Sequence, residues 1–239
     1  MSIEPEQLRA FLEGSIHEDS GWTSEVVRTL TRDGRSVVDL LTGILRSESS
    51  LRQVATSSYR HLNGFDKIVL ASFGRELCKL RLHVWWGDRE KDTRENIHNH
   101  RWDFAAAILY GSYRFQMYEI GEGQDFYEYS YRSPEDDGYY VMNFVSRTSA
   151  RCVLDAQVRA GARYHLSHIS LHRVSANADQ TVVTLMCQAS PLSGATRVLS
   201  EKVIPNAQHV PVDRMSAVEI KTKLERVIAI LDNDTEMRP

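Results

Sequence analysis

The sequence predicts a mainly β protein, an antiparallel sandwich or barrel with helices at both ends. Between residues 65 and 200 the chain consists of short runs rich in Val, Ile, Tyr, Phe and Thr, separated by Gly, Asp or Asn. No amphipathic helix interrupts these runs, which argues against alternating strands and helices around a parallel sheet. The two ends instead repeat apolar residues with the period of a helix.

The predicted helical segments have one-sided apolar stripes, which we interpret as packing faces. The first is expected to stop at Gly14, and the second to be capped by Thr23 or Ser24 and to close at Asp33. The segments are residues 4–14, 22–34, 36–47 and, near the C-terminus, 213–234.

The predicted strands fill the middle of the chain. They are residues 65–73, 78–86, 103–120, 126–131, 139–147, 150–155, 162–167, 170–176 and 181–189. We therefore divide the chain into a helical segment at 1–60 that packs on the barrel, a β-barrel at 61–205, and a C-terminal helix and tail at 206–239.

Composition narrows the class of protein. Hydrophobic residues make up 42% and charged residues 26% of the 239 residues, and the formal net charge is -3. Because no basic field is present, we expect neither nucleic acid nor a membrane surface as a partner. Three cysteines without paired spacing argue against a disulfide framework or a thiolate zinc site. No signal peptide or membrane-spanning run is evident, so we expect a cytoplasmic protein.

The stretch ENIHNHRWDF, residues 95–104, carries the first candidate metal ligands. If it is a strand, His98 and His100 point to the same face because side chains alternate along a strand. A third ligand could come from His165, His168 or His172 in the segment GARYHLSHISLHRVSA. His172 lies early in a predicted strand, whereas His168 lies in a predicted turn.

These two segments together resemble the cupin superfamily. The first cupin motif places His-x-His upstream of a glycine, which matches His98, His100 and Gly111, and the second matches loosely from Gly161 to His172. The resemblance covers residues 65–200 and implies a double-stranded β-helix, or jelly-roll, barrel. It also implies that His98, His100 and His172 bind a metal.

The sequence departs from the cupin pattern at the position of the metal-binding glutamate, where Phe104 stands. The adjacent Asp103 is the candidate for an extra ligand, although on a regular strand it would face away and only a bulge would turn it inward. A three-histidine site is therefore preferred over a site that includes Asp103. Such a site is distantly similar to that of cysteine-dioxygenase-type cupins, but the cross-linked cysteine and Ser-His-Tyr triad of that group are missing.

Residues 78–86 alternate polar and apolar side chains. If the polar face looks into the barrel, Arg81 could bind a substrate carboxylate and His83 could act as a hydrogen-bond or acid–base group. If the apolar face looks inward, both side chains are solvated. On a regular strand, Trp102 would point to the same face as His98 and His100, and together with Phe104 it could form a wall of the metal pocket. The predicted substrate-binding residues are thus Arg81, His83, Trp102 and Phe104.

The function that the resemblance implies is a non-haem metal-dependent oxygenase acting on a small-molecule metabolite with O2. Fe(II) is the expected metal, and Mn, Ni, Cu or Zn are the alternatives, because imidazole ligands suit several of these ions. A redox-neutral isomerase, lyase or hydrolase is a second hypothesis, and a non-catalytic small-molecule-binding cupin is a third. A homodimer is an expected assembly because cupins are often dimers.

Overall fold

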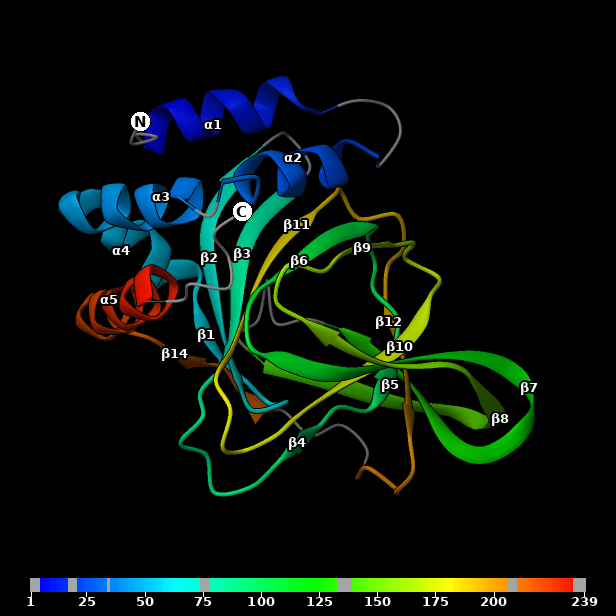
Figure 1. Cartoon of the computed structure of the whole chain (residues 1–239). Coiled ribbons are helices and arrows are strands. Elements are labelled where there is room, and N and C mark those ends of the chain that lie inside the picture. The colour runs from blue at the N-terminus through cyan, green and yellow to red at the C-terminus, as the bar shows by residue number, and fades with distance from the viewer. Residues whose placement is uncertain are drawn as a thin grey trace.

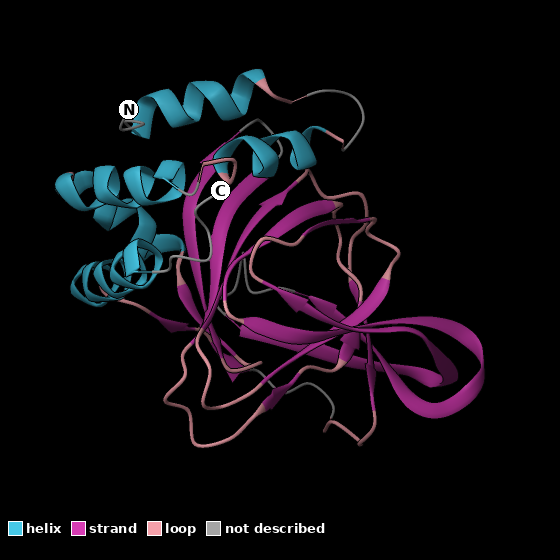
Figure 2. Cartoon of the chain, in the orientation of Figure 1, coloured by secondary structure: helices cyan, strands magenta, loops and turns pink. Residues whose placement is uncertain are grey.

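Two antiparallel sheets of seven strands each form the body of the protein, and helices pack on one side of it (Figures 1 and 2). The computed structural model describes residues 5–16, 21–33, 35–73, 78–132, 139–205 and 210–233. The predicted mainly β fold, with antiparallel sheets in the middle of the chain and helices at its two ends, is confirmed. None of the described helices is long and apolar enough to span a membrane.

The helices lie at the two ends of the chain. They are α1 (Pro5–Gly14), α2 (Trp22–Leu30), α3 (Arg35–Arg46), α4 (Glu48–Ser57) and α5 (Ala217–Asn233).

The first sheet has the strand order β14-β1-β2-β3-β11-β6-β9, and the second has the order β13-β8-β7-β12-β5-β10-β4. The strands of the first sheet are β1 (Tyr59–His61), β2 (Phe65–Phe73), β3 (Cys78–Trp85), β6 (Phe104–Tyr110), β9 (Arg163–Leu166), β11 (Val182–Gln188) and β14 (Asp213–Arg214). Those of the second are β4 (Thr93–Arg94), β5 (Ile97–His98), β7 (Ser112–Arg132), β8 (Tyr139–Arg159), β10 (Leu171–Ala176), β12 (Thr196–Ser200) and β13 (Val210–Pro211).

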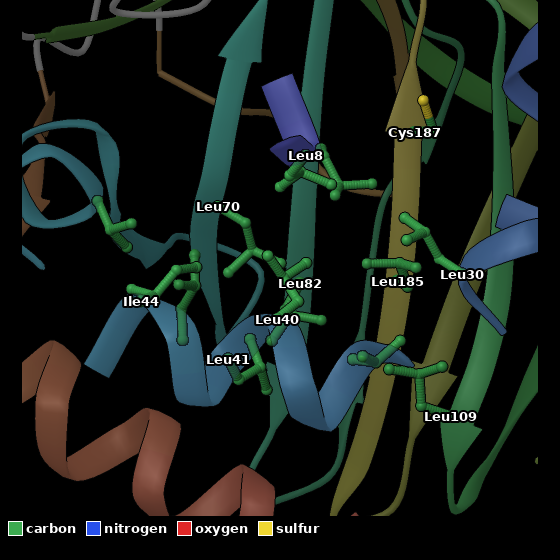
Figure 3. Close-up of a cluster of buried hydrophobic side chains, with 14 of the residues drawn as sticks. Leu8, Leu30, Leu40, Leu41, Ile44, Leu70, Leu82, Leu109, Leu185 and Cys187 are labelled. Carbon is green, nitrogen blue, oxygen red and sulfur yellow. The ribbon is translucent and has the colours of Figure 1, made fainter. Parts of the chain in front are cut away.

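The helices cover the outer face of the first sheet, and the main hydrophobic core fills the layer between them (Figure 3). In this layer Leu82 of β3 lies beside Leu40 of α3, and Leu185 of β11 lies beside Leu30 of α2. Every second residue of β3 therefore points out toward the helices. The residues between them point into the barrel, because side chains alternate across a sheet.

The start of α2 differs from the sequence prediction. The helix begins at Trp22 after Gly21, and no side chain caps it, so the predicted cap at Thr23 or Ser24 is wrong. Thr23 is instead fully buried in the first turn. The helix ends at Leu30, before the predicted Asp33. Asp33 lies shortly before α3, and its Oδ1 accepts a hydrogen bond from the Ser36 amide in the first turn of that helix at 3.0 Å.

Helix α4 and strand β12 are among the elements that were not predicted. Helix α4 follows α3 after a single residue, Ser47, whose hydroxyl accepts a hydrogen bond from the Ser50 amide at 3.2 Å. Strand β12 lies between β7 and β5 in the second sheet. Conversely, the separate runs predicted at 126–131, 139–147 and 150–155 are parts of the long strands β7 and β8.

Gly111 divides β6 from β7 within the predicted strand 103–120. Its φ of +75° lies in the left-handed region, which favours glycine. A Cβ at this position would lie 2.2 Å from the carbonyl oxygen of Thr181, so no other residue fits without a shift of the backbone. The glycine of the first motif is therefore required by the turn that starts β7.

Candidate metal centre

Three histidines converge on the inner side of the barrel. Each of His98, His100 and His172 offers a side-chain nitrogen, and these nitrogens lie within 4.8 Å of one another. His98 on β5 is paired directly with His172 on β10 across the second sheet. Of the three downstream candidates, His172 is therefore the one that joins the pair, while His165 is exposed on β9.

Hydrogen bonds orient two of these imidazoles. Nδ1 of His98 lies 2.9 Å from the carbonyl oxygen of Asn96, and Nδ1 of His172 lies 3.1 Å from that of Ser170. A carbonyl only accepts, so each Nδ1 carries the proton and donates it. In a neutral ring this leaves the lone pair of Nε2 available, which is the arrangement found in metal-binding histidines.

The surroundings keep His100 and His172 uncharged. Burial lowers the pKa of His172 to about 3, and the neighbouring His98 adds to the effect. Burial also holds the pKa of His100 well below its usual range, with His98 and His172 contributing. Because a metal binds neutral imidazole, these shifts favour coordination over protonation at neutral pH.

Aromatic rings hold His100 in place. Its imidazole stacks on Trp102 with ring centroids 4.2 Å apart and an interplanar angle of 14°. The edge of Phe104 meets the same imidazole at 4.9 Å. The structure thus places Trp102 and Phe104 as walls beside the histidines, and the side chain at the position of the usual cupin glutamate is a packing residue.

Asp103 lies outside the histidine group. The chain from Asn99 to Asp103 is irregular, not the continuation of a strand, and only Ile97–His98 forms β5. The Oδ1 atom of Asp103 accepts hydrogen bonds from the His168 amide at 2.6 Å and from His168 Nδ1 at 2.8 Å. The structure therefore does not support Asp103 as an extra ligand: its carboxylate fastens the 167–170 turn to the loop that carries His100.

A cavity of about 350 Å³ adjoins the three histidines. The inward residues of β3, Arg81 and His83, line it, and both are more than nine-tenths buried. The interpretation in which these side chains are solvated is wrong, because helices cover the apolar face of β3. The guanidinium of Arg81 lies 4.4 Å from the ring centroid of Trp102, so the cation rests against the ring that supports His100.

Several cavity residues were missed by the sequence prediction. Glu95, three residues before His98, lines the cavity, and burial raises the pKa of its carboxyl. The hydroxyls of Tyr113 and Tyr164 share a hydrogen bond of 2.7 Å in the same cavity, and burial raises both pKa values. Glu95 lies within the stretch ENIHNHRWDF, so its closeness to the histidines in sequence could have marked it as a cavity residue. No sequence feature could have marked the tyrosines, because β7 and β9 meet only in the folded chain.

The residues present fit a divalent metal ion. Among the described residues, no carboxylate or thiolate joins the three histidines as a ligand atom. Three imidazole ligands suit Fe, Ni, Cu or Zn and leave coordination positions for other molecules. The donor set supports metal binding without selecting among these ions.

The chain was compared with known proteins. No protein-family model and no curated protein matches the sequence. Solved structures that resemble it include a hydroquinone 1,2-dioxygenase in complex with Cd²⁺ and 4-hydroxybenzonitrile, at 14% identity and a TM-score of 0.34, covering 60% of this chain and 74% of that one.

Two further structures are a conserved protein from Klebsiella pneumoniae with a double-stranded β-helix domain and the polyketide cyclase RemF from Streptomyces resistomycificus. The first is 12% identical with a TM-score of 0.33, covering 62% of this chain and 95% of that one. The second is 13% identical with a TM-score of 0.35, covering 67% and 80%. At these identities, any functional assignment depends on the residues of this chain alone.

Proposed function

We propose that the protein is a non-haem, metal-dependent oxygenase that holds Fe(II) with His98, His100 and His172 and acts on a small molecule with O2. The observation that supports this most strongly is the donor set: three histidine imidazoles at the wall of an aromatic-lined cavity. Such a set keeps positions open for both a chelating substrate and O2. When bound, Fe(II) supplies the electron-transfer chemistry that O2 requires.

Arg81 is proposed to bind an anionic group of the substrate beside the metal. Its guanidinium is buried, lines the cavity and lies against the face of Trp102. A planar guanidinium can donate two parallel hydrogen bonds to a carboxylate, which fixes the orientation of the substrate as well as its charge. His83, two residues further along β3, faces the same cavity and could donate to or accept from the substrate.

The remaining cavity residues are proposed to exclude water and hold protons. Trp102 and Phe104 shield the imidazole of His100. The Tyr113–Tyr164 pair stays protonated because burial raises both pKa values, so at least one hydroxyl remains a hydrogen-bond donor. The chain would thus position the substrate while keeping the reaction away from bulk water.

Anaerobic loading tests this function. Metal-free protein would be loaded separately with Fe(II), Mn(II), Ni(II) and Zn(II), and O2 consumption followed with panels of small carboxylic acids, thiols and phenols. The proposal expects metal binding and substrate-dependent O2 consumption in the Fe(II) form. Failure to bind any of these ions would contradict the metal site, and O2 uptake that no substrate stimulates would contradict the oxygenase.

Glu95 favours a second function, a redox-neutral isomerase, lyase or hydrolase that uses the metal as a Lewis acid. Its carboxyl is buried in the same cavity with a raised pKa, which is a property of groups that transfer protons near neutral pH. Turnover that persists without O2 and disappears in Glu95→Gln would support this reaction over oxygenation.

A further inference from the structure

We propose that a second part of the cavity, formed by Lys67, His83 and Trp85, binds a carboxylate at the end of the substrate remote from the metal. We call these three residues the β2–β3 wall. The inference rests on the proposed function, because it names the class of molecule that the metal-dependent site accepts: a chelating head, an apolar body and an anionic tail.

The wall is built by the register of two neighbouring strands. Lys67 of β2 lies directly opposite His83 of β3, and all three residues line the cavity. Arg81, His83 and Trp85 are spaced two apart on one face of β3, so each step along the wall is roughly 7 Å. Arg81 lies against Trp102, which stacks on His100. Arg81 therefore marks the metal end of β3, and Trp85 marks the opposite end.

Two buried nitrogens of this wall lack a hydrogen-bond partner. Among the described residues, nothing pairs with Nε2 of His83 or with Nε1 of Trp85. The two side chains are 8% and 2% exposed. A buried polar atom without a partner is destabilising, and native proteins rarely keep one without a reason. Two of them on the same face of one strand, beside a cavity, indicate a place where a ligand supplies the acceptor atoms.

The charge of the wall selects an anion. The positive charges of Arg81 and Lys67 contribute, after burial, to holding the pKa of His83 well below its usual range, so this imidazole is neutral while both cations lie near it. The indole nitrogen of Trp85 only donates hydrogen bonds. Glu95 is the carboxyl among the cavity residues, and its raised pKa reduces the repulsion that it would exert. A carboxylate matches this combination of donors.

Aromatic rings surround the β2–β3 wall. Phe65 packs against His83 and Trp85, with ring centroids 4.5 and 4.8 Å away. Trp85 also meets Tyr113 at 5.8 Å. Trp102 and Phe104 line the same cavity beside His100, so a molecule that spans from the histidines to the β2–β3 wall meets aromatic rings at both ends. A hydrocarbon chain or ring fits such surroundings better than a sugar or a peptide.

The experiment compares dicarboxylates with monocarboxylates of the same chain length. The full chain loaded with Zn(II), which does not support O2 chemistry, would be titrated calorimetrically with succinate, adipate and suberate, and with butyrate, hexanoate and octanoate. A longer dicarboxylate is expected to bind about tenfold more tightly than its monocarboxylate partner, the contribution of a hydrogen bond to a charged group. Trp85→Phe and Lys67→Met should each abolish most of this advantage.

Lys221→Met is the matched control, because Lys221 lies on α5 with its side chain 57% exposed, and it should keep the full advantage. Equal binding of mono- and dicarboxylates to Zn(II)-loaded protein would overturn the inference, as would an advantage that survives both variants. If circular dichroism shows that Trp85→Phe does not fold, the binding advantage measured with Lys67→Met tests the inference.

If the protein binds dicarboxylates through Lys67 and Trp85 but binds no metal, the carboxylate site is supported and the proposed metal-dependent function is contradicted.

Discussion

His172 lies directly opposite His98 across the β5–β10 pair, and their imidazole rings are 4.7 Å apart. Each ring donates its Nδ1 proton to a backbone carbonyl two residues earlier in the chain. The same local arrangement thus occurs on both sides of a cross-strand pair, and it leaves both Nε2 atoms as donors of a lone pair. His100, supported by Trp102, supplies the third nitrogen.

Removing His172 should abolish metal binding. His172→Ala eliminates one of three ligands together with its cross-strand partner contact, so metal affinity is expected to fall by more than roughly 100-fold, beyond the effect of losing an outer-shell partner. Metal content after loading and gel filtration measures this. His165→Ala, on the exposed side of β9, is the control and should retain the metal. Full occupancy in His172→Ala would remove this residue from the site.

Replacing Asp103 should affect stability and leave the metal in place. Asp103→Ala removes the two hydrogen bonds to His168 and should lower the free energy of unfolding by about 1–2 kcal/mol, since the carboxylate is mostly buried. Urea denaturation and metal analysis of the same preparation separate the two effects. Loss of the metal with unchanged stability would show instead that Asp103 is a ligand.

The metal-free protein should become less stable on acidification. The pKa of His172 is about 3 in the folded chain, whereas the ordinary histidine value is 6.5, so between these values the unfolded chain binds more protons than the folded one. Stability is therefore full above about pH 6.5 and falls as the pH decreases toward 3, by up to about 1.4 kcal/mol per pH unit for each such histidine. Urea denaturation across this range checks the sign, and His172→Gln should give a shallower dependence. A stability that rises on acidification would contradict the burial of neutral imidazoles.

Gly111 should tolerate no side chain. Gly111→Ala combines a positive φ with a Cβ placed 2.2 Å from the Thr181 carbonyl oxygen, and we expect a loss of about 2 kcal/mol or more in the free energy of unfolding. Gly194→Ala is the matched control, because nothing lies within 4 Å of the position of its Cβ. Similar stabilities for the two variants would mean that the turn between β6 and β7 is not constrained as described.

The sequence allowed the prediction of the histidines because their signal is local. The spacing of His98 and His100, and the strand that begins just before His172, can be read from short segments. The face of β3 that lines the cavity could not be decided in this way, because alternation offers two faces and only the packing of the helices on Leu82 selects one. The usual apolar-inward pattern of small barrels favoured the wrong face.

The Tyr113–Tyr164 contact could not be predicted, because it depends on residues far apart in the sequence. Tyr113 and Tyr164 lie 51 residues apart in the sequence, and nothing near either tyrosine predicts the contact.

Asp103 was expected to face away from the histidines on a regular strand, and its side chain does lie apart from them. The reason is different, however, because the loop from Asn99 to Asp103 is irregular and a hydrogen-bonded turn holds the carboxylate.

The central claim is that an all-histidine centre binds the metal, and anomalous diffraction at the iron edge from anaerobically loaded crystals tests it most directly. We predict a single anomalous peak bonded to Nε2 of His98, His100 and His172, with Asp103 still paired with His168. A loaded protein without a peak between these three imidazoles, or with a peak bonded to the Asp103 carboxylate, would contradict it.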